Sequence, residues 1–222
     1  MDKIVIGIVE DDDAQINSIC RTLYSHFHKN ADLSSKFELD FKPYDISKNL
    51  DSILREITDD IEKTSIDFII VDYKIVSKNS NTNGVEIVTK LKNIVKEFPT
   101  IVLTEREAEC SRIMDIDPDK IYSKKGFLQA KGDYSIEASN KIFKNIFRYS
   151  NKKAALINRI NELIKANEDS GDLDNIDELL TLEKELSDYY PDGETSVEKA
   201  LDRATLNEIV TLIEKANALL EE

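Results

Sequence analysis

Apolar residues follow two alternating patterns over the first 150 residues of the chain. Short runs of β-branched and other apolar residues, typical of strands buried on both faces of a sheet, lie at residues 4–9, 68–71 and 100–103, with weaker runs at 37–41 and 121–123. Between these runs, apolar side chains recur at helical spacing in stretches that begin near residues 16, 50, 88 and 142, and a short helix fits residues 105–115. Strands alternating with helices predict an α/β fold, a five-stranded parallel sheet with helices on both faces.

After about residue 150 only helical patterns remain. The first covers residues 156–164 and can continue a helix that starts near residue 136. The second covers residues 176–190 and ends at a Pro-Asp-Gly turn, and the third starts at residue 195 with the spacing of a capping box. We therefore predict two domains, residues 1–148 and an all-α extension of residues 149–222.

Charge separates the same two parts. The 222 residues include 30 basic and 44 acidic ones, a formal net charge of −14. Residues 151–222 hold 8 basic and 18 acidic residues, so −10 of this charge lies there and −4 in the first 150. Such an excess of acids disfavours nucleic-acid phosphates and anionic bilayers as partners. The last predicted helix has only Lys199, Arg203 and Lys215 as basic residues, so we expect it to contact a protein, or a second copy of the chain, and not DNA.

The cysteines and the hydropathy bear on the compartment. Cys20 and Cys110 are isolated, without metal-ligand spacing or a disulfide framework. No apolar run approaches the ~20 residues that span a bilayer. We therefore expect a cytoplasmic protein without a membrane segment.

Polar residues follow directly after four of the five predicted strands. Residues 10–13 (Glu-Asp-Asp-Asp) come after the first strand, Asp72 after the third, Thr104 after the fourth and Lys124 and Lys125 after the fifth. In an open parallel sheet these carboxyl ends meet at one edge, where sites form. The pattern predicts a site that combines an acid cluster, a lone acid, a hydroxyl and an ammonium.

This set of groups suits phosphoryl transfer. Carboxylates held together repel one another, and Mg²⁺ (or Mn²⁺) relieves the repulsion through hard oxygen ligands. A carboxylate beside such a cation can act as a nucleophile toward phosphorus, and a lysine and a hydroxyl can bind the remaining phosphoryl oxygens.

The residues at these strand ends resemble the receiver domain of two-component response regulators. The resemblance lies in residues 6–12, 67–73 and 101–104, in Gly84 at the head of a helix, and in residues 121–124. It implies a flavodoxin-like sheet of order 2-1-3-4-5. It also implies phosphoryl transfer to the aspartate after the third strand, from a histidine kinase or a histidine phosphotransfer protein.

Position by position, the resemblance implies a role for each matching residue. Asp72 would be the phosphoacceptor, Asp11 a direct Mg²⁺ ligand and Glu10 a ligand acting largely through water, and the Lys74 carbonyl would complete the metal shell. The switch and phosphoryl-binding residues would be Thr104, Lys124 and the aromatic Tyr122, or Ile121 in its place. Two assignments stay open: the acidic pair can be Asp11 and Asp12, and the lysine can be Lys125.

The sequence also departs from the family pattern. The loop between Asp72 and Gly84 is long and lacks the usual proline, and the position after Thr104, normally small, is Glu105. Lys74 and Arg106 lie two residues after Asp72 and Thr104, where charged groups can shield an acyl phosphate or hinder its formation.

Two functions fit these residues. The first is a signalling phosphoacceptor with output through protein contacts, or a phosphate sink. The alternative is a pseudo-receiver scaffold that is never phosphorylated. We do not expect an enzyme, because an aspartate-dependent phosphohydrolase needs a second acid two residues after its nucleophile, where Lys74 stands. An Asp72 far from Asp11, or a Lys or Arg ion pair in place of the cation, would argue against phosphorylation.

Two further residue types have simpler interpretations. Asp13 fits the N-cap of the first helix. His26 and His28, near the end of that helix, are expected at the surface, where cations suit the helix dipole.

Overall fold

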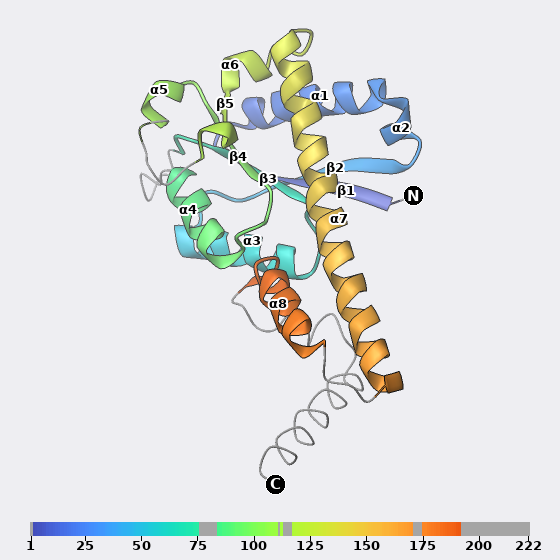
Figure 1. Ribbon diagram of the computed structural model, residues 1–222. Helices are drawn as coiled ribbons and strands as arrows, with labels where there is room; N and C mark the ends of the chain where they lie inside the picture. Colours follow the sequence, from blue (N-terminus) through green and yellow to red (C-terminus); the bar gives the residue numbers. More distant parts are fainter. Residues whose placement is uncertain (1, 76–83, 111, 113–116, 171–174, 192–222) are drawn as a thin grey trace. The chain divides into compact units, whose positions relative to one another are not determined.

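A computed structural model describes residues 2–75, 84–110, 112, 117–170 and 175–191. Its centre is a sheet of five parallel strands in the order β2-β1-β3-β4-β5 (Figure 1). The strands are β1 (Asp2–Val9), β2 (Phe37–Pro43), β3 (Phe68–Asp72), β4 (Thr100–Thr104) and β5 (Ile121–Ser123). The predicted fold class and strand order are confirmed: the sheet, with its helices, is consistent with a flavodoxin-like fold.

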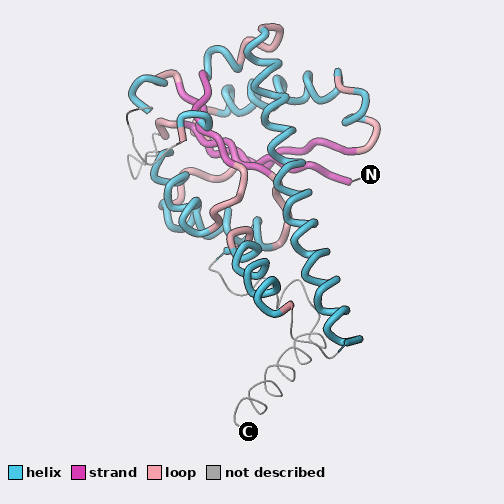
Figure 2. Tube along the Cα trace, viewed as in Figure 1, coloured by secondary structure: helices cyan, strands magenta, loops and turns pink. Residues whose placement is uncertain are grey.

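Helices follow each strand, as Figure 2 shows. The described helices are α1 (Asp13–Lys29), α2 (Ala31–Ser34), α3 (Leu50–Glu62), α4 (Gly84–Ile94), α5 (Glu107–Cys110), the 3₁₀ turn η1 (Pro118–Lys120), α6 (Lys124–Phe127), α7 (Asp133–Ser170) and α8 (Ile176–Ser187). The helical pattern at 156–164 does continue the earlier helix, because α7 is one element of 38 residues. The third predicted helix of the extension lies outside the described residues.

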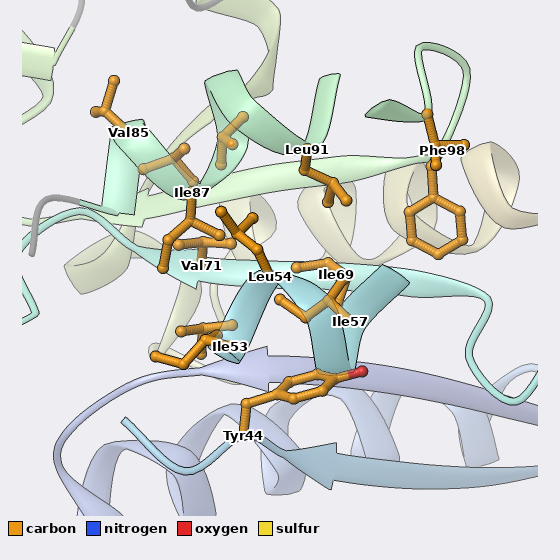
Figure 3. Packing of buried hydrophobic residues seen from close by; sticks show 14 of the residues in the cluster. Tyr44, Ile53, Leu54, Ile57, Ile69, Val71, Val85, Ile87, Leu91 and Phe98 are labelled. Carbon is orange, nitrogen blue, oxygen red and sulfur yellow. The ribbon is translucent and has the colours of Figure 1, made fainter. Parts of the chain in front are cut away.

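Two apolar layers hold the sheet. Alternate strand residues such as Ile69, Val71 and Val102 pack with α3 and α4 on one face, as Figure 3 shows for part of this cluster. Ile6, Ile8 and their neighbours pack with α1 and the first half of α7 on the other. The central strands are buried on both faces, which explains why they appear in the sequence as continuous apolar runs.

Two details differ from the sequence-based expectations. The N-cap of α1 is Asp12, whose Oδ1 accepts the N–H of Ala14 at 2.8 Å, while Asp13 is already helical, so the capping assignment was one residue off. His26 is buried and not at the surface, because Ser135 of α7 covers it with a hydrogen bond of 3.1 Å. His28 is exposed as expected.

The chain divides into two compact units, residues 1–149 and 150–222, and α7 runs from the first into the second. Within the second unit, the Arg159 guanidinium pairs with Glu178 of α8 at 2.8 Å, and the Lys153 ammonium lies 4.0 Å from the Tyr190 ring centre. In the part of the chain that the structure describes, no helix has the length and apolar character of a membrane span.

Candidate functional site

The carboxyl ends of β1, β3, β4 and β5 bring four side chains to one edge of the sheet. Glu10 follows β1, Asp72 and Thr104 end β3 and β4, and Lys124 follows β5 as the first residue of α6. All four are buried, although each is polar or charged. Burial of this kind requires partners, because an unpaired charge inside a protein is costly.

Three carboxylates converge at this edge. Ligand oxygens of Glu10, Asp11 and Asp72 all lie within 4.8 Å of one another, and Asp11 is exposed whereas the other two are buried. The turn after β1 fixes Glu10, because its Oε1 accepts the backbone N–H groups of Asp11 at 3.1 Å and Asp12 at 3.2 Å. Asp72 thus lies close to Asp11, as the phosphoacceptor hypothesis requires.

Lys124 joins two of these acids. Its Nζ donates to Glu10 Oε2 at 2.5 Å and to Asp72 Oδ1 at 2.6 Å, and only 4% of its side chain is exposed. The other oxygen of Asp72, Oδ2, accepts the Lys74 backbone N–H at 3.0 Å. Lys125, the alternative lysine, is exposed.

Burial sets the protonation behaviour of the cluster. It raises the pKa of Glu10 to about 7, against the opposing effect of the hydrogen bond from Lys124. It also raises the pKa of Asp72 above the ordinary aspartate value. Burial alone would lower the pKa of the Lys124 ammonium, but its hydrogen bonds to Asp72 and Glu10 raise the pKa above the usual lysine value. The buried carboxylates therefore retain protons more readily than free ones, and a positive charge nearby favours their ionised form.

Thr104 ends β4, the strand that lies between β3 and β5 in the sheet. The Thr104 hydroxyl accepts the Arg106 backbone N–H at 2.8 Å and is almost fully buried. Glu105 and Arg106 are exposed, and the Arg106 guanidinium pairs with Glu109 of α5 at 3.3 Å. The structure therefore gives the Arg106 side chain a partner outside the acid cluster.

The remaining predicted residues take varied positions. Asp12, the alternative acid, caps α1, which gives its carboxylate a structural role. Tyr122 is buried in the layer with α1 and α7, while Ile121 is half-buried in the layer with α3 and α4. The Lys74 side chain is exposed, and residues 76–83 of the long loop lie outside the described residues.

Gly84 packs directly on the site from the start of α4. A Cβ on this residue would lie 1.8 Å from the Asp72 carbonyl oxygen, so only glycine fits here. Its N–H donates to the Tyr73 carbonyl at 3.0 Å, which ties the head of α4 to the end of β3.

Sequence reasoning missed Tyr134 of α7. Its hydroxyl accepts the Ser123 N–H at 2.7 Å, immediately before Lys124. The sequence carried no signal for it, because the contact depends on the turn that α6 makes between β5 and α7.

The donor set fits a divalent cation in charge and chemistry. Carboxylate oxygens are the hard ligands that Mg²⁺ and Mn²⁺ prefer. With all three acids ionised, the cluster carries three negative charges against the one positive charge of Lys124, an excess that a divalent ion would balance. Lys124 nonetheless forms the kind of ion pair expected to disfavour a cation, so a metal would compete with it for Glu10 and Asp72.

Comparison of the sequence with known protein families and with curated proteins found no match. The strand order and the side chains at the sheet edge are therefore the observations on which a functional assignment depends.

Proposed function

We propose that this chain is a response-regulator-like signalling protein that accepts a phosphoryl group on Asp72. The observation that carries the proposal is the convergence of the Glu10, Asp11 and Asp72 oxygens within 4.8 Å, with the Lys124 ammonium on Asp72. Burying an acid beside two further acids and a lysine lowers the stability of the fold. A role in phosphoryl transfer would explain why the chain has such a cluster.

The chemistry assigns a task to each group. An oxygen of the Asp72 carboxylate forms a bond to phosphorus while the bond from phosphorus to the leaving group of the donor breaks, and the leaving group departs with that electron pair. Lys124 would move from the free carboxylate to a phosphoryl oxygen, and Thr104 would offer its hydroxyl to another. A divalent ion held by Glu10, Asp11, Asp72 and the Lys74 carbonyl would neutralise charge on the transferred group.

The proposed partners follow from this role. The donor would be the phosphohistidine of a histidine kinase or of a histidine phosphotransfer protein in the cytoplasm. Repacking near β4 and β5 after phosphorylation would change a protein contact, and the C-terminal helices would bind the effector or a second copy of the chain.

Phosphorylation can be tested with a small donor. The protein is incubated with Mg²⁺ and acetyl phosphate and weighed by mass spectrometry, and beryllofluoride binding is measured in parallel. We expect one added phosphoryl group, lost in Asp72→Asn and retained in Asp12→Asn, which keeps a side chain able to cap α1. Asp11→Asn should weaken Mg²⁺ binding while the fold persists, because Asp11 is exposed.

A scaffold function without phosphorylation is the second candidate, and Lys124 is the observation that favours it. Its ammonium already pairs with Glu10 and Asp72, so the cluster has an internal counter-ion. Glu105 and Lys74 add exposed charged groups around the site. Failure of the wild-type protein to form either adduct in the presence of Mg²⁺ would favour this scaffold function.

A further inference from the structure

Tyr134 contacts the segment that carries Lys124 on both sides of the lysine. The tyrosine lies in the first turn of α7, and its hydroxyl accepts the Ser123 N–H at 2.7 Å. Its ring lies against Gly126, where an added Cβ would be 2.8 Å from ring atom Cδ1. Ser123, directly before Lys124, and Gly126, two residues after it, thus both contact the same side chain.

The helix that carries Lys124 is short. Lys124 begins α6, a helix of four residues whose N-cap is Ser123. The Ser123 hydroxyl accepts the Gly126 N–H at 3.3 Å, a weak bond at the long end of the range. A single helical turn has little stability of its own, so its position depends on contacts from outside it.

We infer that Tyr134 is a positioning residue that holds the β5–α6 turn so that the Lys124 ammonium reaches between Glu10 and Asp72. Lysine has four rotatable side-chain bonds and loses much conformational freedom when it is held in one place, so a small shift of its backbone changes which acids it can reach. The part of this inference that concerns binding of a phosphoryl group rests on the proposed function. The position of the Lys124 ammonium can be tested whether or not the proposed function holds.

The contact also connects the site to α7. Tyr134 lies on the helix that continues past the division between the two units at residues 149 and 150. The next residue, Ser135, hydrogen-bonds to His26 of α1. A shift of Lys124 would therefore reach the first turn of α7 through its contact with Tyr134.

The first test measures the reactivity of the Lys124 amine. Wild-type protein, Tyr134→Phe and the control Tyr24→Phe, another exposed tyrosine on α1, are treated with an amine-reactive reagent without metal. Modification of Lys124 is followed by mass spectrometry, with exposed Lys125 as the internal reference. Loss of one hydrogen bond should raise Lys124 reactivity by about fivefold in Tyr134→Phe alone. Equal reactivity in all three proteins would overturn the inference.

The second test separates positioning from a general structural role. Beryllofluoride affinity with Mg²⁺ is measured for Tyr134→Phe, Lys124→Gln and the double variant. We expect Tyr134→Phe to weaken binding by about fivefold in the wild-type background and to have no effect beside Lys124→Gln, because it acts through the lysine. Additive losses would contradict the inference.

The two tests keep the hypotheses apart. A wild-type protein that binds no beryllofluoride would remove the proposed function, and the reactivity of Lys124 would still decide whether Tyr134 positions it. A wild-type protein that binds beryllofluoride, together with unchanged affinity in Tyr134→Phe, would support the phosphoacceptor and remove the role of Tyr134.

Discussion

At the scale of single residues, the site depends on a lysine shared by two acids. The sequence placed Glu10, Asp72 and Lys124 at one edge, because each follows a buried apolar run. It left Lys124 and Lys125 as alternatives, because both lie within reach of the strand end. Lys124 pairs with Glu10 as well as Asp72 because the turn after β1 holds the Glu10 carboxylate in place. The backbone geometry of that turn has no signature in the sequence.

Removal of Lys124 should destabilise the metal-free protein. Lys124→Ala leaves two buried carboxyl groups without their counter-ion, and breaking a buried pair typically costs about 3–5 kcal/mol of unfolding free energy. Lys125→Ala, at an exposed position, should change this quantity by less than about 0.5 kcal/mol. Urea denaturation at neutral pH measures both. Equal stabilities for the two variants would show that the ion pairs contribute little.

His26 gives a prediction about pH. Burial lowers the pKa of its imidazole, and Lys29 lowers it further, so the folded state favours the neutral ring that bonds to Ser135. The unfolded chain takes up this proton near pH 6.5, so the His26 contribution to stability is complete above that pH and is lost as pH falls through the folded-state pKa. His26→Gln should therefore flatten the acid side of the stability profile in urea titrations. His28→Gln, on an exposed ring, is the control, and a profile unchanged in His26→Gln would contradict the prediction.

At the scale of elements, length and periodicity decided what could be predicted. The central strands and the helices α1, α3, α4 and α7 are long enough to show their pattern in the sequence. The missed elements, α2, α6 and η1, have three or four residues each, too few to define a period. The missed N-cap has a similar cause, since Asp12 and Asp13 are chemically equal and only the backbone geometry selects between them.

The junction of β3 and α4 carries the element-scale prediction. Gly84→Ala would place a Cβ 1.8 Å from the Asp72 carbonyl oxygen, so the head of α4 or the end of β3 must move. We expect a loss of about 1–3 kcal/mol in unfolding free energy, together with weaker Mg²⁺ binding. Gly132→Ala is the matched control, because its nearest contact would be 3.2 Å, and it should cost less than about 1 kcal/mol. Equal effects of the two substitutions would show that the close packing at Gly84 is not needed.

At the scale of the whole molecule, charge and fold give different information. The alternation of elements was enough to predict a parallel sheet with right-handed crossovers, whereas the strand order, which the structure confirms, was implied by the family resemblance. The charge difference between −4 in the first 150 residues and −10 in the remainder indicates only which partners are disfavoured.

Divalent cations should stabilise the entire folded chain if the acid cluster binds them. A ligand that binds only the folded state adds RT ln(1 + [L]/Kd), or about 1.4 kcal/mol at ten times its Kd. Mg²⁺ and Mn²⁺ should therefore raise the unfolding free energy of the wild-type protein in a saturable way, whereas KCl at equal ionic strength should not. Asp11→Asn should reduce the gain, because the exposed Asp11 offers one of the three converging ligand oxygens. In Lys124→Gln the gain should be larger than in the wild type, since the cation no longer competes with an ammonium for Glu10 and Asp72. A wild-type gain from Mg²⁺ no greater than that from KCl would show that Lys124 already serves as the counter-ion of the cluster, in agreement with the scaffold function.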